Sequence, residues 1–163
     1  MERTRIKEIT TIGILTALSV VLFSLIRIPL FGNIKLDLSY IVLTVAIVKC
    51  KMSGAIFVGG VGALIESMLY GVNGLSFSWI IANIIIAIIG KIFYELSIKQ
   101  NKKFIFILGL FIGCLIGLLI VKTLIECLLF EIPLLLKMST NAVAFISDFI
   151  CMLIGVIVVE RIN

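Results

Sequence analysis

Long apolar runs alternate with short polar segments along this chain, and they predict membrane-spanning helices. A helix needs about 20 mostly apolar residues to cross a bilayer, and such runs recur from one end of the sequence to the other. They end at turn-forming residues such as Pro29, Pro133 and the stretch Gly71–Gly74. The predicted spans cover about 8–28, 37–48, 54–70, 77–94, 104–130 and 138–159. The second span is short and weak, and a loop over residues 29–36 precedes it.

The composition agrees with this pattern. Hydrophobic residues make up 62% of the 163 residues and charged residues 14%, whereas soluble domains carry about 25% charged residues. The mean hydropathy is +1.32. We therefore expect an all-α integral membrane protein, a single domain over residues 1–163 that forms a compact bundle of six transmembrane helices. The basic start is followed by an apolar run without a small-residue cleavage pattern, so we expect no cleaved signal peptide.

Basic residues are distributed unevenly between the two sides that this threading defines. With the N-terminus inside, one side collects Arg3, Arg5, Lys7, Lys49, Lys51, Lys91, Lys99, Lys102, Lys103 and Arg161. The other side collects Arg27, Lys35 and Lys137, and Lys122 is left out because it lies within a span. Lys and Arg accumulate in cytoplasmic loops. Both termini are therefore predicted to be cytoplasmic, in a multi-pass protein of a bacterial plasma membrane, and the net charge of +5 indicates orientation rather than a nucleic-acid partner.

The residue types present restrict the chemistry. The chain has no histidine and its four cysteines form no CxxC pair, so zinc sites of the HExxH type and Ser-His-Asp catalysis are excluded. Glu66, Glu126 and Asp148 could serve as acid and base in an intramembrane enzyme, but an activated nucleophile is missing. We expect no catalytic residue, no metal site and no enzyme activity.

Charged residues within the spans fall toward one side of the membrane. They are Asp37, Glu66, Lys122, Glu126 and Asp148, and Asn83 and Asn141 are at a similar depth. A charge at the centre of a bilayer costs roughly 2.5–3.5 kcal/mol on insertion scales, so it is tolerated mainly in a bundle interior or a wet cavity. The convergence predicts a polar pocket that opens to the exterior and binds a small molecule.

Three alternatives stay open for these polar residues. Lys122 and Glu126 are spaced i, i+4 and could neutralise each other on one helix face. The buried charges could contact polar substituents of a ligand, or they could form a network that holds the helices together. Trp79 could stack on a ligand ring, or it could anchor its helix at the membrane interface.

Small residues recur at helical spacing in two spans. Gly109, Gly113 and Gly117 form a double GxxxG, and Gly13 with Ala17 forms a small-xxx-small pair in the first span. Such faces let helices approach closely in lipid. The glycines of the fifth span suit packing within the bundle, whereas the face of the first span could instead bind a partner protein.

Two stretches carry a resemblance to a known family. The first comprises Arg27-Ile28-Pro29 and the run from Asn33 to Ile41, which contains Lys-Leu-Asp-Leu-Ser, and the second is Gly74 to Asn83 with Trp79 and Ala82-Asn83. Together with six short spans, they resemble the substrate-binding S components of energy-coupling factor (ECF) vitamin transporters. The Lys-Leu-Asp-Leu-Ser stretch is most similar to riboflavin-type members, and related stretches occur in folate-type and hydroxymethylpyrimidine-type members. The chain lacks the prolines that family members often have soon after this stretch and before helix three, which argues against riboflavin itself.

The resemblance implies a function and its partners. An S component captures a vitamin or vitamin precursor from outside, under a lid formed by the loop between spans one and two. It docks on a transmembrane coupling protein through the small-residue face of helix one, here Gly13 and Ala17. Two cytoplasmic ATPases then drive uptake, so ATP is used by partner subunits, and this chain, which has no GxxxxGK[ST] motif, is expected to bind no cofactor.

The pocket predicted from charges and the pocket implied by the resemblance coincide. The candidate substrate-binding residues are Lys35, Asp37, Ser39, Tyr40, Glu66, Trp79, Asn83, Lys122, Glu126, Asn141 and Asp148. Amide side chains offer donors and acceptors suited to the edge of a flavin, pterin or pyrimidine ring. The alternative function is that of a structural protein of the MreD type, a six-span cell-shape protein that acts through protein partners.

Overall fold

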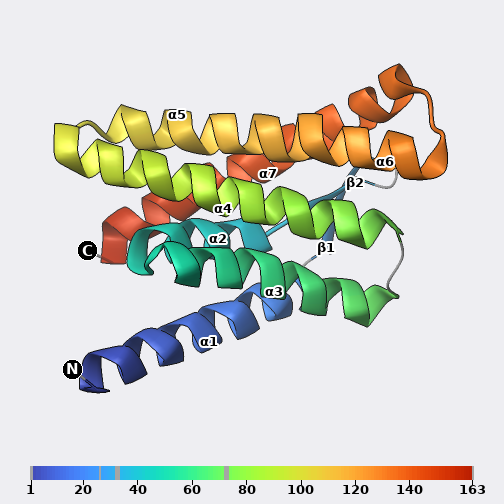
Figure 1. Ribbon diagram of the computed structural model, residues 1–163. Helices are drawn as coiled ribbons and strands as arrows, with labels where there is room; N and C mark the ends of the chain where they lie inside the picture. The colour runs from blue at the N-terminus through green and yellow to red at the C-terminus, as the bar shows by residue number, and fades with distance from the viewer. Residues whose placement is uncertain (1, 26, 32–33, 72–73, 163) are drawn as a thin grey trace.

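The computed structural model describes residues 2–25, 27–31, 34–71 and 74–162. Its elements, in chain order, are α1 (Glu2–Leu25), β1 (Arg27–Phe31), β2 (Ile34–Asp37), α2 (Ser39–Lys49), α3 (Met52–Tyr70), α4 (Gly74–Gln100), α5 (Lys103–Cys114), the π-helical segment η1 (Leu115–Lys122), α6 (Thr123–Phe130) and α7 (Leu134–Ile162). The helices lie roughly side by side, with both termini at the same end of the bundle (Figure 1). The predicted turn over residues 71–74 begins at Gly71 with a φ of 89°, and its residues 72 and 73 lie outside the described part.

Five helices are long and apolar enough to cross a membrane: α1, α3, α4, the continuous helix formed by α5, η1 and α6, and α7. The 11-residue α2 is apolar but short, and at 1.5 Å per residue it extends about 16 Å. The prediction of a bundle of membrane-spanning helices is confirmed. The prediction that all six helices cross the membrane is not matched by the length of α2, and the orientation of the termini stays a prediction.

A β-hairpin replaces the loop predicted for residues 29–36, and the prediction that span one continues to Ile28 is wrong. Helix α1 ends at Leu25, and β1 pairs antiparallel with β2, with Arg27 opposite Asp37 and Pro29 opposite Lys35. The sequence between the strands is Gly-Asn, a pair typical of two-residue hairpin turns. This signal could have predicted the hairpin. Its two residues lie outside the described part of the chain.

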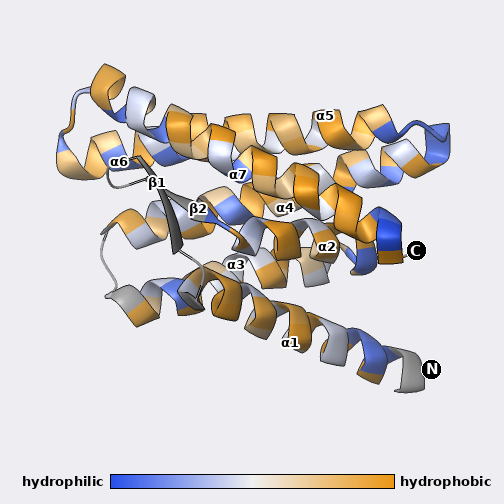
Figure 2. Cartoon of the chain, turned by 180° about the vertical axis from the view of Figure 1, so that it is seen from behind, coloured by the Kyte–Doolittle hydropathy of each residue, from blue (hydrophilic) through white to orange (hydrophobic). Residues whose placement is uncertain are grey.

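The short helix α2 lies in the core of the bundle. It packs against α1, α3, α4 and α7, and its side chains Tyr40, Ala46 and Ile47 are at most 1% exposed. The outward surface is apolar instead, as expected for a surface in contact with lipid, with Leu128 and Leu135 more than 80% exposed. In Figure 2 the hydrophobic colour covers most of the helix lengths, and hydrophilic residues gather near the ends.

The glycines of the fifth span pack within the bundle, which decides between the two interpretations of that motif. A Cβ atom at Gly117 would lie 2.8 Å from the carbonyl oxygen of Ala82 in α4, and one at Gly113 would lie 3.5 Å from the Cα atom of Ile86. These residues therefore let α4 and the fifth span approach closely. The π-helical turn η1 follows in the same span, and such turns are frequent at functional sites.

Candidate substrate-binding site

The hairpin of β1 and β2 lies toward the end of the bundle opposite the two termini (Figure 1), and several of the predicted site residues belong to it and to the helices around it. The hairpin follows α1, leads into the buried α2 and contacts α7 through β2. This connection places the start of α2 among the long helices. The backbone N–H of Ser39 donates to Oδ1 of Asp37 at 2.9 Å, so the carboxylate at the end of β2 caps the first turn of the helix.

The aromatic pair Tyr40 and Trp79 joins α2 to α4. The Trp79 indole N–H donates to the Tyr40 hydroxyl at 3.3 Å, and the Tyr40 side chain is 1% exposed. The ring centroid of Phe23 in α1 lies 5.0 Å from that of Trp79, with the ring planes tilted by 40°. The Trp79 ring thus contacts side chains of two neighbouring helices, α1 and α2. This position favours a role in the site over anchoring at the membrane interface.

A small cavity lies beside this pair, between α1, α2, α3 and α4. Its volume is about 10 Å³, and its lining residues are Ser19, Ser39, Leu43, Val58, Gly59, Ala63, Glu66 and Asn83. A cavity of roughly this size holds one water molecule, so a larger ligand would require the surrounding elements to move apart. In the described chain, the hairpin of β1 and β2 is the connection between α1 and α2.

Two side chains in this cavity have polar partners. Glu66 is 2% exposed, and the Ser19 hydroxyl of α1 donates to its Oε1 atom at 3.2 Å. The Asn83 amide donates to the backbone carbonyl of Trp79 at 3.0 Å, which leaves its side-chain oxygen as an acceptor for other groups. Ser19 was not among the predicted site residues. Its position on the buried face of α1, four residues after the buried Leu15, was the signal that could have indicated it.

Carboxyl groups from β2, α3 and α7 lie within electrostatic range of one another. Asp37 interacts with both Glu66 and Asp148, and Lys122 is the cation that interacts with Asp148. Asp148 is 7% exposed and accepts a hydrogen bond from Ser147 at 3.3 Å. Three carboxyl groups and one ammonium group offer several hydrogen-bonding positions to a polar ligand.

A second polar cluster contains Glu126, which the structure separates from Lys122. Ser78 donates to its Oε1 atom at 3.0 Å, Asn141 donates to Oε2 at 3.1 Å, and the Lys137 ammonium lies 3.1 Å from Oε2. The Asn141 amide also donates to the Thr123 hydroxyl at 3.0 Å. The alternative that Lys122 neutralises Glu126 is not what the structure shows: the ion pair of Glu126 is with Lys137, and it joins α6 to α7.

Lys91 and Lys35 complete the set of candidate cations. Lys91 was counted among the basic residues of the cytoplasmic side; it is 6% exposed and donates to the carbonyls of Ile47 and Cys50 at 3.0 and 2.6 Å. Because these carbonyls end α2, the cation stabilises the C-terminus of that helix. Lys35 belongs to β2, and its side chain lies outside the part that the structure describes.

Comparisons with known proteins identify the family. The family model described as "ECF-type riboflavin transporter, S component" matches residues 3–162. Among solved structures, the crystal structure of the S component for biotin from an ECF-type ABC transporter superposes with a TM-score of 0.67 at 19% identity, covering 99% of this chain and 93% of that chain. No curated protein matches.

The two matches point to the same architecture. The likeness to the biotin protein shows the fold, and the family match extends over nearly the whole sequence. Neither match supports the MreD-type alternative. This chain belongs to the ECF-type riboflavin transporter S-component family, the membrane-integral substrate-binding components of vitamin transporters.

Proposed function

We propose that this chain captures a flavin-, pterin- or pyrimidine-like vitamin or vitamin precursor from outside the cell, for ATP-driven uptake. The observation that carries the proposal is the convergence of Asp37, Tyr40, Glu66, Asn83 and Asp148 from five elements at the hairpin end. Ionisable groups within a membrane protein cost free energy, and those that occur usually mark a substrate or ion pathway. The hairpin is the lid of this site, and a ligand enters when the lid moves away from α7.

The orientation supports capture from outside. Both termini and the connection between α4 and α5, which contains Lys102 and Lys103, lie at the end of the bundle opposite the hairpin (Figure 1). Basic residues accumulate on the cytoplasmic side. The hairpin and the site beneath it then face the exterior.

The test of ligand capture uses the single tryptophan, Trp79, as a reporter. The purified protein is titrated with riboflavin, folate, thiamine, pyridoxine, hydroxymethylpyrimidine and biotin while the fluorescence is recorded, and mass spectrometry identifies any co-purified molecule. We expect saturable quenching by one of the ring compounds at nanomolar concentration. No response to any of them, with no co-purified small molecule, would contradict the proposal and return attention to a structural role.

The partner surface is the outward face of α1. Gly13 has no heavy atom within 4 Å of the position a Cβ would take, and its neighbours Ile9 and Ile14 are 69% and 61% exposed. Helix α1 is also the least buried of the five long helices. Gly13 and Ala17 therefore lie on an unfilled surface that suits close packing of a helix from the coupling protein, which in turn works with two cytoplasmic ATPases.

Larger side chains on this surface should prevent vitamin uptake without affecting ligand binding. Gly13→Leu and Ala17→Leu should abolish vitamin uptake by cells that contain the coupling module, while the purified variants bind ligand like the unmodified protein. Val143→Leu on the exposed face of α7 is the matched control, and it should leave uptake unchanged. Loss of ligand binding in Gly13→Leu would show that this face belongs to the bundle rather than to a partner.

A further inference from the structure

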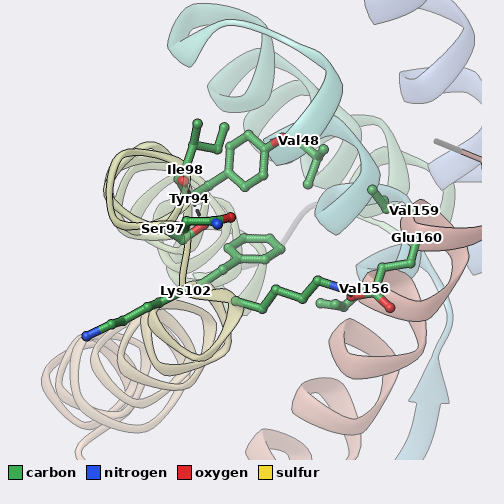
Figure 3. Close-up of a pocket in the computed structure, with 11 residues that line it drawn as sticks. Val48, Tyr94, Ser97, Ile98, Lys102, Val156, Val159 and Glu160 are labelled. Carbon is green, nitrogen blue, oxygen red and sulfur yellow. Dashed lines mark hydrogen bonds and ion pairs between the residues drawn. The ribbon is translucent and has the colours of Figure 1, made fainter.

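A second cavity lies at the end of the bundle opposite the substrate site. Its volume is about 200 Å³, and it lies where α2, α4, α5 and α7 end or begin (Figure 3). Small-molecule sites usually measure about 300–1,000 Å³, so this cavity would hold only part of a larger molecule. It also shares no residue with the cavity beside Glu66. The substrate site does not account for it.

The lining of this cavity has an apolar part and a polar rim. The rings of Tyr94 and Phe106 meet edge to face, with centroids 5.1 Å apart, and Val156 of α7 also lines the apolar part. Asn101 and Lys102 line the rim at the turn between α4 and α5. In Figure 3 the Lys102 side chain extends outward from the rim, while the Tyr94 ring lies among the apolar side chains. A ligand that fits both parts has a charged head and a hydrocarbon portion.

Charges around the rim favour an anionic head. Lys102 and Lys103 both line the cavity, and the one carboxylate among the lining residues, Glu160, is ion-paired with Lys103 at 2.9 Å. Lys91 does not line the cavity, but its buried ammonium lies 5.1 Å from the centroid of the Tyr94 ring, which does. The balance of these groups is positive. Basic pockets between membrane helices on the cytoplasmic side suit the head groups of anionic lipids.

We propose that this cavity binds one anionic phospholipid, with its phosphate at the Lys102–Lys103 rim and the start of an acyl chain against Tyr94 and Phe106. The cavity opens at the end of the spanning helices, which is the depth at which head groups meet hydrocarbon. A bound lipid bridges the ends of α4, α5 and α7, and Lys103 exchanges its Glu160 partner for the phosphate. The proposal does not depend on the identity of the vitamin.

Native mass spectrometry of the delipidated full-length protein tests this directly. The protein is titrated with dioleoyl phosphatidylglycerol and, separately, with dioleoyl phosphatidylcholine, which has the same chains and no net charge. We expect one phosphatidylglycerol adduct that forms well below the concentration at which phosphatidylcholine adducts appear. The double variant Lys102→Gln, Lys103→Gln should lose about tenfold to thirtyfold of this preference, the scale expected for two lysines at a lipid surface. Lys99→Gln, an exposed lysine at the same end that does not line the cavity, should retain it.

A variant with all charges intact separates the cavity from the charged surface. Val156→Phe fills the apolar part and should displace the adduct, whereas Val143→Phe on the exposed face of the same helix should not. The Tm of Val156→Phe in detergent, compared with that of Val143→Phe, reports whether the protein is folded. Equal binding of the two lipids, an unchanged adduct in both the lysine and Val156 variants, or displacement of the lipid by millimolar inorganic phosphate would each overturn the proposal.

Discussion

Two buried glutamates at the hairpin end of the bundle differ in their surroundings. Glu126 is 1% exposed, and three groups from α4 and α7, including the ammonium of Lys137, satisfy its carboxylate. Glu66 is 2% exposed, but within the described chain it receives one hydrogen bond, from Ser19, and it borders a cavity. The two residues are almost equally buried, but they differ in the number of hydrogen-bond and ion-pair partners that the protein supplies to the carboxyl group.

The difference assigns a different role to each carboxylate. A buried charge with a full set of partners stabilises the arrangement of the helices that supply these partners. Removing one member leaves the remaining charge buried without compensation, which destabilises the protein strongly. A buried carboxylate with free acceptor capacity beside a cavity is instead available to a ligand. Glu126 therefore joins α4, α6 and α7, and Glu66 is the one of the two that we propose for contact with the ligand.

The largest effect is expected on stability, from Glu126→Leu. This change leaves the Lys137 ammonium, which is 18% exposed, without its counter-ion and removes the acceptor of Ser78 and Asn141. Breaking a buried ion pair in this way should cost about 3 kcal/mol, read as a lower Tm in detergent by differential scanning fluorimetry. Glu126→Gln keeps one acceptor oxygen in place of two and nearly the same volume, so it should lose less. A variant that melts like the unmodified protein but binds vitamin weakly would reverse the assignment.

The next effect is expected on affinity, from Glu66→Gln. The amide retains the shape of the side chain and an acceptor for Ser19, so the Tm should change little. A hydrogen bond to a charged group contributes about 1.5–3 kcal/mol, so the Kd for the vitamin should rise by roughly tenfold or more. Fluorescence titration measures this, with Glu126→Gln as the matched control that should keep its affinity. Unchanged affinity in Glu66→Gln would remove Glu66 from the site.

The smallest effect on stability and affinity is expected for an exposed ion pair. It serves as the reference for the changes at Glu126 and Glu66. Glu8 and Lys51 join α1 to the start of α3 at 2.8 Å, and the Lys51 side chain is 77% exposed. Exposed ion pairs contribute less than about 1 kcal/mol, so Glu8→Gln should alter neither the Tm nor the Kd measurably. A loss of stability as large as that of Glu126→Leu would mean that burial does not explain the difference between these contacts.

The chain's own pattern predicts most of its fold because the bilayer restricts the choice. With no water to satisfy backbone groups, long apolar segments must form helices, and five of the predicted spans correspond to helices of sufficient length. The hairpin after Leu25 was missed because Pro29 and Gly32 were interpreted as loop residues. The burial of α2 in the core was also missed, because a short apolar helix has the same composition whether it lies in a protein core or faces lipid.

Residue types and depth, which the sequence alone determines, indicated that Asp37, Glu66 and Asp148 share one end of the bundle. Only the tertiary structure decided which partner each polar group has. Lys122 lies near Asp148 rather than pairing with Glu126, and Lys91 caps α2 instead of facing water. The physical reason is that depth follows from position along a single helix, whereas a hydrogen bond or ion pair depends on how two helices rotate against each other. That rotation is set by packing between helices, such as the close approach of Gly117 to the backbone carbonyl of Ala82, which acts between segments far apart in the chain.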